Sequence, residues 1–244
     1  MGTPKKTILI TGASGGIGTH LSRYFLLRGY NMALHYFNNK INIASINTGT
    51  LPGKIITYKA DIRNEQEIEQ MVSAIKTDFG TIDILINNAG VIKNGMSWKL
   101  PLEHWQIVID TNLTGVFLTT KHCLPLMRAN NWGRVINISS VIASAGLAGS
   151  SAYAASKAAL AGFVKTVAIE IADKNITVNN IAAGYMDTGM VDDIPVGLKE
   201  TILKEIPVKK FGDPEEICAL AEYIISDNAS YFTGQTIALN GGMN

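Results

Sequence analysis

The sequence is poor in the features that mark several classes of protein. Only two cysteines occur among 244 residues, Cys123 and Cys218, and their spacing is not that of metal ligands, so we expect no metal site. Such sparse cysteine is typical of a reducing compartment, and we expect both residues to be small apolar parts of a core. No run approaches the roughly 20 apolar residues of a membrane span. The apolar run at residues 8–10 is too short for a signal-peptide core, so we expect a cytoplasmic protein.

An excess of charge of one sign is also absent. The formal net charge is +1, and the lysines and arginines are scattered along the chain rather than clustered. A chain without a basic patch lacks the electrostatic footprint of nucleic-acid binding or of an anionic membrane surface. We therefore expect its partners to be small molecules and further copies of the same chain.

What the sequence does contain is an alternation of short β-branched runs with longer helical patterns from end to end. This alternation predicts an α/β fold, a doubly wound parallel sheet with helices on both faces. Seven strands are predicted, at residues 7–11, 31–36, 54–59, 82–87, 134–139, 177–181 and 236–239. Helices are predicted at residues 16–28, 64–79, 102–127, 151–172 and 214–226.

No repeat or linker divides the chain, so residues 1–244 are expected to form a single domain. We place a cofactor half at roughly residues 1–140 and a substrate half at roughly residues 141–244. Residues 184–203 are the least regular stretch and are expected to be a loop with short helices that covers a cleft as a lid.

A glycine-rich turn follows the first predicted strand and leads into a helix. Glycines let the backbone approach a pyrophosphate closely, while the helix N-terminus offers free N–H groups and the positive end of its dipole. The cofactor contacts expected from this turn are Gly12, Ser14, Gly15, Gly16, Ile17 and Gly18. Taken alone the turn is weakly specific, because a purely structural strand-to-helix turn shows the same pattern.

Tyr153 and Lys157 lie four residues apart and share one face of a predicted helix. A phenol with a pKa of about 10 is a poor acid–base group at neutral pH, and a neighbouring ammonium group lowers that pKa. Ser140 ends the preceding strand, where a hydroxyl can hold a carbonyl oxygen while the tyrosine donates its proton. Ser139 is the alternative, and strand alternation would point the two hydroxyls in opposite directions.

These motifs, together with Asn87-Asn88-Ala89-Gly90 and Asp110-Thr111-Asn112-Leu113, resemble the short-chain dehydrogenase/reductase family over essentially the whole chain. The resemblance implies a Rossmann fold and a nicotinamide-dependent oxidoreductase. It implies that Ser140 orients a substrate carbonyl and that Tyr153 is the acid–base group. It further implies that Lys157 lowers the pKa of Tyr153 and holds the nicotinamide ribose, and that Asn112 holds a proton-relay water. The remaining cofactor contacts that we expect are Tyr36, Asn38, Asn39, Asp61, Ile62, Asn88, Ala89, Gly90, Tyr153, Lys157, Gly184, Met186 and Thr188.

The chain departs from the family after the sixth strand, where the usual Pro-Gly is replaced by Ala183-Gly184. The loss of a proline with its fixed φ leaves this loop less pre-organised, but it removes no reacting group. Contacts from Gly184, Met186 and Thr188 to the cofactor are thus less firmly implied than those of the glycine turn.

The end of the second strand bears on the choice of cofactor. NAD-dependent members place an acid there, which binds the ribose diol and repels a 2′-phosphate. This chain has no Asp or Glu at residues 33–40, which favours NADP(H) over NAD(H), although Gly15 stands where many NADP-dependent relatives have arginine. Candidates to bind the phosphate are Ser14, Asn38, Asn39 and Lys40. His35 is expected to be a half-buried strand residue rather than a ligand.

Residues 105–112, 132–137, 206–212 and 239–242 are similar to the branch of the family that reduces 3-oxoacyl thioesters. This similarity implies a 3-oxoacyl-[acyl-carrier-protein] reductase or its relative acetoacetyl-CoA reductase. Lys93, Arg128 and Lys174 are candidates for cationic contacts to a carrier at the mouth of the cleft. Two alternatives stay open, a dehydrogenase of a sugar or another secondary alcohol, and a nucleotide-sensing protein that has lost turnover.

The predicted helix at residues 151–172 holds more alanine and glycine than one buried face requires. Small residues let helices pack closely, so a second face of this helix is expected to meet another subunit. Related proteins form tetramers through this helix, and we expect a homotetramer. An ordinary alanine-rich helix packed on the sheet is the alternative.

Overall fold

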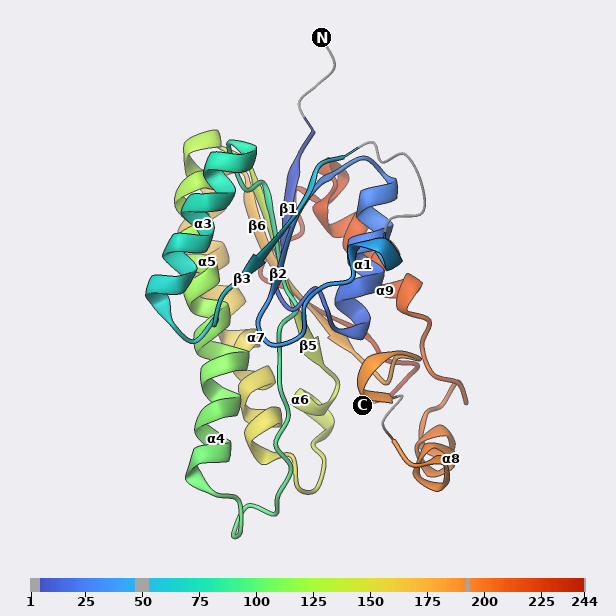
Figure 1. The fold of residues 1–244 in the computed structure, drawn as a ribbon. Helices are drawn as coiled ribbons and strands as arrows, with labels where there is room; N and C mark the ends of the chain where they lie inside the picture. The colour runs from blue at the N-terminus through green and yellow to red at the C-terminus, as the bar shows by residue number, and fades with distance from the viewer. Residues whose placement is uncertain (1–4, 47–52, 192–193, 244) are drawn as a thin grey trace.

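The computed structural model describes residues 5–46, 53–191 and 194–243, which form a central sheet between two layers of helices (Figure 1). Within these residues the sheet has seven strands in the order β3-β2-β1-β4-β5-β6-β7, and every neighbouring pair is parallel. The strands are β1 (Thr7–Ile10), β2 (Asn31–Tyr36), β3 (Ile55–Lys59), β4 (Ile84–Asn87), β5 (Gly133–Ser140), β6 (Ile176–Ala183) and β7 (Thr236–Leu239). The doubly wound sheet predicted from the sequence is thereby confirmed.

The helices divide between the two faces of the sheet. Helices α1 and α9 cover one face, and α3, α5 and α7 cover the other (Figure 1). Strand side chains alternate between these layers, so Ile8 and Ile10 join the core beneath α1 and α9 while Leu9 joins the opposite core. The helices are α1 (Gly16–Leu27), α2 (Ile43–Ile46), α3 (Glu65–Phe79), α4 (Leu102–Ile109), α5 (Gly115–Asn130), α6 (Ile142–Ala145), α7 (Ser151–Ile171), α8 (Val196–Glu205) and α9 (Pro214–Ile225).

The helix expected at residues 102–127 is interrupted. A π-helical turn, Asp110–Thr114, separates α4 from α5, and the helical stretch continues to Asn130. Such turns insert one residue into a helix and occur often at functional sites. This turn carries Asn112, whose side chain is completely buried.

A ladder of buried asparagines crosses the sheet on the face covered by α5 and α7. Asn87, Asn137 and Asn180 are register partners on β4, β5 and β6, and Thr236 follows on β7. Each amide nitrogen donates to the next strand, at 2.8 Å, 3.0 Å and 3.0 Å in that order. Because an unsatisfied buried amide is costly, these bonds fix the register of four strands, from the last residue of β4 to the first residue of β7.

The irregular stretch at residues 184–203 partly follows the prediction. Its described residues include a bridge of Met186 to Gly212, a 3₁₀ turn at Gly189–Val191 and most of α8. Residues 192–193 of the expected lid lie outside the described residues, as do residues 1–4 at the N-terminus. Cys123 and Cys218 are free and buried in α5 and α9, as expected. In the part of the chain that is described, no helix has the length and apolar character needed to cross a bilayer.

Candidate active site

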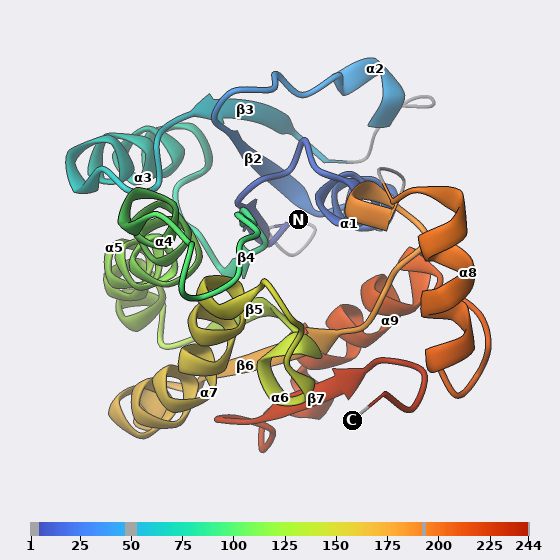
Figure 2. The ribbon, with the colours of Figure 1, turned by 90° about the horizontal axis from the view of Figure 1, so that it is seen from below.

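The residues singled out from the sequence gather at the carboxyl edge of the sheet, onto which Figure 2 looks. The glycine turn follows β1 and the Asn88 segment follows β4, on the two sides of the point where strand order reverses. In open α/β sheets the crevice at this reversal is where ligands bind. Ser140 ends β5 beside it, and α7 begins close by with Tyr153.

The two serines at the end of β5 make different contacts. Ser139 Oγ donates to the backbone carbonyl of Lys157 at 3.2 Å and so ties the strand to α7. Ser140 Oγ accepts the N–H of Ile142 at 3.2 Å, and its hydroxyl lies against Tyr153. Ser140 is therefore the serine beside the phenol, and Ser139 is a structural anchor.

Tyr153 and Lys157 are both almost fully buried, at 8% and 5% exposure. Burial raises the pKa of Tyr153 above its ordinary value, while its hydrogen bond with Ser140 acts in the opposite direction. Burial also lowers the pKa of Lys157 to about 8. The Nζ atom of Lys157 lies 5.8 Å from the ring centre of Tyr153 and donates to the carbonyl of Ile138 at 2.7 Å. The structure thus holds Tyr153 as a neutral phenol, and activation of it by Lys157 stays a prediction.

Asn112 connects the loop after β4 to α7. Its amide oxygen accepts the N–H of Val91 at 2.8 Å, and its nitrogen donates to the carbonyl of Val91 at 2.9 Å and to Ser156 Oγ at 3.1 Å. A Cβ added to Gly90 would lie 3.3 Å from the Asn112 oxygen and 3.6 Å from Lys157 Nζ, so Gly90 leaves room between these side chains. The side chain of Asn112 therefore links the loop after β4 to α7, and the water that it was expected to hold stays a prediction.

The glycine turn is held from the β4 side. Asn88 Nδ2 donates to the carbonyls of Thr11 and Gly12 at 3.1 Å and 2.9 Å, and Thr11 Oγ1 accepts the N–H groups of Asn88 and Ala89. Gly12 has φ +63°, and an added Cβ would lie 2.7 Å from the Ala89 Cα. Only glycine fits this conformation and this close approach.

The start of α1 has free N–H groups where the sequence predicts an anion site, and the binding of a pyrophosphate there stays a prediction. The bond from Thr19 N–H to Gly15 O, at 2.8 Å, closes the first turn of α1. The N–H groups of Gly16, Ile17 and Gly18 precede it at the positive end of the helix dipole, where a pyrophosphate fits. A Cβ on Gly16 would lie 2.5 Å from Thr188 Oγ1, so the segment after β6 packs directly on this turn.

Fewer of the residues expected to contact the adenosine part of the cofactor have free groups than of those expected to contact the pyrophosphate. Asn38 and Asn39 are exposed directly after β2, next to the half-buried Tyr36. The carboxylate of Asp61 is engaged by the guanidinium of Arg63, at 2.6 Å in the shortest bond, and that bond lowers the pKa of Asp61. An adenine contact by Asp61 therefore stays a prediction. The same holds for Ile62, which is buried against α5.

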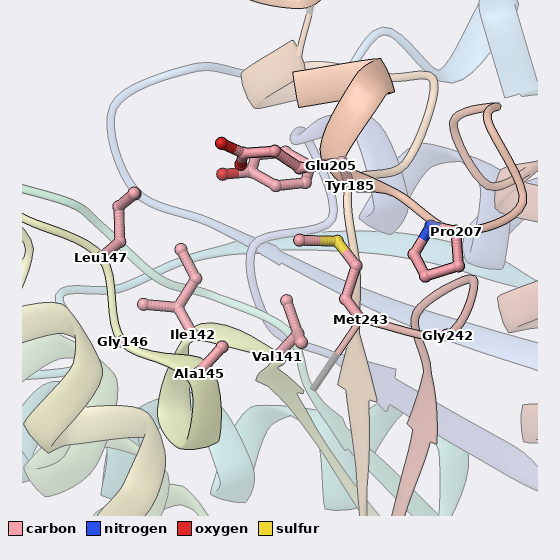
Figure 3. A pocket seen from close by; sticks show the side chains of 10 residues that line it. All are labelled: Val141, Ile142, Ala145, Gly146, Leu147, Tyr185, Glu205, Pro207, Gly242 and Met243. Carbon is pink, nitrogen blue, oxygen red and sulfur yellow. The ribbon is translucent and has the colours of Figure 1, made fainter. Parts of the chain in front are cut away.

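A cavity of about 320 Å³ opens next to the catalytic candidates (Figure 3). Figure 3 shows Val141, Ile142 and Met243 on one side of the space, with Tyr185 and Glu205 on the other. Val141 and Ile142 share an apolar cluster with Tyr153, against which Met243 packs. The remaining lining residues are Ala145, Gly146, Leu147, Pro207 and Gly242. A mostly apolar pocket beside a buried phenol and a serine hydroxyl can hold a carbonyl compound with an aliphatic chain.

Several of these lining residues were not anticipated from the sequence. Glu205 ends α8, and Met243 follows β7, far along the chain from Tyr153. No local motif marks either residue. Met243 reaches the pocket because β7 lies next to β6 in the sheet, with β5 beyond it. Of the cationic candidates, Lys93 follows β4 on the site's edge. Arg128 and Lys174 precede β5 and β6 at the opposite edge, so within one chain their assignment to the cleft mouth was wrong.

Comparison with known proteins agrees with this geometry. A family model described as enoyl-(acyl carrier protein) reductase matches residues 12–244. The chain belongs to the short-chain dehydrogenase/reductase family, and it is an oxidoreductase that acts on a ketone or secondary alcohol with a nicotinamide cofactor.

The individual relatives narrow the comparison. The chain is 35% identical over 240 residues to a 3-oxoacyl-[acyl-carrier-protein] reductase FabG of Staphylococcus epidermidis, covering 98% of both chains. It is 37% identical over 240 residues to the protein of the same name from Thermotoga maritima, covering 98% of this chain and 97% of that one. It is also 38% identical over 242 residues to nodulation protein G of Azospirillum brasilense, covering 98% of both chains.

Proposed function

We propose that this protein reduces a 3-oxoacyl thioester, carried on acyl-carrier protein or on coenzyme A, to the 3-hydroxyacyl thioester with NADPH. The observation that carries the proposal is a buried phenol that shares an apolar cluster with two residues of the pocket wall, Val141 and Ile142. Tyr153 has a raised pKa, and Ser140 lies at its hydroxyl. The names of the relatives described above support the same substrate class.

The side chains divide the work of ketone reduction between them. The nicotinamide, when bound, supplies the hydride to the carbonyl carbon. Ser140 donates a hydrogen bond to the carbonyl oxygen, and Tyr153 delivers a proton to that oxygen as charge develops on it. The ammonium group of Lys157 provides positive charge 5.8 Å from the ring centre of Tyr153, and Asn112 ties α7 to the loop after β4.

The pocket suits the two ends of such a substrate differently. The side chains of Val141, Ile142 and Leu147 give an acyl chain an apolar wall. Glu205 and Tyr185 give the opposite wall polar oxygens, and burial, followed by the nearby carboxylate of Glu205, raises the pKa of Tyr185. Tyr185 therefore stays a neutral hydrogen-bond donor toward a thioester or amide group.

The preference for NADPH follows from the end of β2. Asn38, Asn39 and Lys40 are exposed there and no carboxylate stands among them to repel a 2′-phosphate. Gly15, exposed at the start of α1, brings no charge to that phosphate, so the preference rests on the end of β2 alone. We take NADPH as the reductant on this ground.

The test is an assay of purified protein with acetoacetyl-CoA and either NADPH or NADH, followed by loss of the reduced-nicotinamide absorbance. We expect oxidation of NADPH, reduced on the order of 100-fold or more in Tyr153→Phe because the proton donor is lost while the ring is kept. Crotonyl-CoA serves as the enoyl control and should not be reduced. Oxidation of NADPH with crotonyl-CoA but not with acetoacetyl-CoA would refute the substrate class. The absence of NADPH oxidation with both thioesters would refute it as well.

Two alternatives remain as outcomes of the same experiment. Turnover of a sugar or of another secondary alcohol, with no turnover of the thioester, would point to a different dehydrogenase of the family. Binding of the cofactor without turnover of any ketone or alcohol would point to a nucleotide-sensing protein. The intact set of Asn112, Ser140, Tyr153 and Lys157 argues against the second alternative.

We also propose that the protein assembles as a homotetramer. Ile169 on α7 is 84% exposed and Phe117 on α5 is 47% exposed, both on the outer side of the helical layer. A Cβ added to Gly162 of α7 would meet nothing within 4 Å, which leaves that face open for close helix packing. Light scattering at micromolar concentration should give four times the chain mass of 26.3 kDa, and a monomer mass would contradict the proposal.

A further inference from the structure

His35 joins two segments that face the cofactor cleft. Its side chain is only 2% exposed, and both ring nitrogens have protein partners. Nδ1 lies 3.1 Å from the backbone nitrogen of Gly12, and Nε2 lies 2.9 Å from the carbonyl oxygen of Ala60. The backbone carbonyl of His35 also accepts the N–H of Ala13 at 2.9 Å. One residue of β2 therefore holds the start of the glycine turn on one side and the end of β3 on the other.

The two partners determine which nitrogen of His35 carries the proton. A backbone N–H can only donate and a carbonyl can only accept, so Nδ1 is unprotonated and Nε2 is protonated. A second proton on Nδ1 would face the N–H of Gly12 and break that bond. Burial lowers the pKa of His35 accordingly, while the bond to Ala60 and the charge of Asp61 act in the opposite direction.

Few other titratable groups face this ring. The glycine turn at residues 11–18 contains no ionisable side chain. On β3 the register partner of His35 is Tyr58, whose hydroxyl donates to Asp78 at 2.7 Å. Asp61, in the loop after β3, is paired with Arg63. The protonation of His35 is therefore governed mainly by its burial and its two hydrogen bonds.

The turn has little freedom to compensate for loss of the bond to His35. Gly12 is in the left-handed region, at φ +63°, and its carbonyl is held by Asn88 and by the N–H of Gly15. The N–H groups of Gly12 and Ala13 both tie the turn to β2, and of these two bonds the one from Gly12 depends on the side chain of His35. A rotated turn would misdirect the N–H groups at the start of α1, which are the donors for a pyrophosphate.

We propose that neutral His35 is a positioning residue for the pyrophosphate turn, and that its protonation weakens the binding of either nicotinamide dinucleotide. The inference rests on the proposed function in that a dinucleotide occupies this turn. Because both ring nitrogens are engaged by the protein, His35 does not bind a 2′-phosphate. The two roles predict opposite pH dependences of dinucleotide affinity. A cationic phosphate ligand would tighten NADPH binding as the pH falls. A positioning histidine would weaken the binding of NADPH and of NADH alike as the pH falls.

The test measures the Kd of NADPH and of NADH by fluorescence, from about pH 4.5 to about pH 8, at constant ionic strength, because burial places the pKa of His35 below its ordinary value. The variants are His35→Leu, which removes both hydrogen bonds, and His35→Asn, whose amide oxygen can accept the N–H of Gly12 but does not ionise. His104→Asn on α4 is the matched control for losing a histidine, and the titration of the 2′-phosphate is common to all four proteins.

We expect His35→Leu to bind both dinucleotides roughly tenfold more weakly at pH 8, the effect of about one buried hydrogen bond. We expect the wild type and His104→Asn to lose affinity for both dinucleotides as the pH falls. His35→Asn should stay within about threefold of the wild type at pH 8 and should lack this extra loss at low pH.

Each other outcome has a separate meaning. Equal affinities of His35→Leu and wild type would overturn the positioning role. A wild-type pH profile matched by His35→Asn would overturn the effect of His35 protonation. Tighter NADPH binding at low pH in the wild type but not in His35→Asn would overturn it in favour of a phosphate ligand. A wild type that binds neither dinucleotide would refute the proposed function instead. If His35→Leu fails to fold by circular dichroism, the comparison of the wild type with His35→Asn still decides.

Discussion

Replacing Lys157 by methionine should stabilise the protein while abolishing its turnover. Lys157 is 5% exposed and carries its ammonium group among buried residues, with one hydrogen bond, to the carbonyl of Ile138. Methionine has a similar length and no charge to desolvate, so it can fill the same space. The substitution separates what the lysine does for the reaction from what it does to the fold.

The magnitude follows from the pKa of Lys157, which burial lowers from 10.5 to about 8. At about 1.4 kcal/mol for each pKa unit, keeping this group charged destabilises the folded state by about 3 kcal/mol at neutral pH. The variant also loses the bond to Ile138, which offsets about 1 kcal/mol of the gain. We therefore expect Lys157→Met to be more stable by about 2 kcal/mol, a rise in Tm of roughly 4 to 8 °C for a chain of this size.

The same reasoning gives the pH dependence and its sign. Below about pH 8 the lysine is charged in both the folded and the unfolded state, and the full penalty applies. Between about pH 8 and pH 10.5 the folded state loses its proton first, so the stability of the wild type rises relative to the variant. Thermal unfolding followed by circular dichroism at about pH 7 and about pH 10, at one protein concentration, measures the change.

Two results would refute this reasoning. A Lys157→Met protein that is less stable than the wild type at pH 7 would mean that the bond to Ile138 outweighs the burial of charge. A difference in stability that does not shrink toward pH 10 would mean that the penalty is not one of charge. Conversion to Lys157→Arg, which retains the charge, is the control and should not stabilise the fold.

The remaining predictions concern the ladder and the glycine turn. Asn180→Val leaves the buried amide nitrogen of Asn137 without its acceptor, so urea unfolding should show a loss of about 1 to 3 kcal/mol. Unchanged stability would mean that water replaces this bond. Gly12→Ala places a Cβ at φ +63° against the backbone of the β4 loop, and fluorescence titration should show NADPH binding weakened about tenfold or more. Gly15→Arg adds a positive charge at an exposed position, where an added Cβ comes no closer than 3.5 Å to a neighbouring atom. The variant should bind NADPH over NADH with about tenfold greater preference than the wild type. Equal gains in affinity for both cofactors would contradict an effect on the 2′-phosphate.

The strands and most helices could be predicted because their patterns are local. The run Val135-Ile136 in β5 is apolar on both faces, as a strand covered on both sides requires, and β5 is buried along its whole length. The π-helical turn Asp110–Thr114 left no such trace, because its residues fit the periodicity of an ordinary helix. The π-helical turn can be recognised only in the folded chain, where the amide oxygen of Asn112 accepts the N–H of Val91.

The site could be predicted only where its residues stand in a motif. Tyr153 and Lys157 are brought together by helical spacing, which the sequence displays directly. Glu205 reaches the pocket through the packing of α8, and no spacing relates it to Tyr153. His35 was expected to be a half-buried strand residue. Its bond to Gly12 joins two neighbouring strands whose register is set only in the folded sheet.

The pKa shifts of Tyr153 and Lys157 bear on the direction of the chemistry. Burial favours the neutral form of both groups, so the pKa of the phenol rises while that of the ammonium falls to about 8. Reduction of a ketone starts from a protonated phenol, which is the form that the structure stabilises. Oxidation of an alcohol starts from a phenolate, and the charges that would stabilise it are the ammonium group of Lys157 and the cationic ring of an oxidised nicotinamide. The resting side chains are therefore those from which proton donation to a ketone begins, while the ratio of reduced to oxidised cofactor decides the net direction.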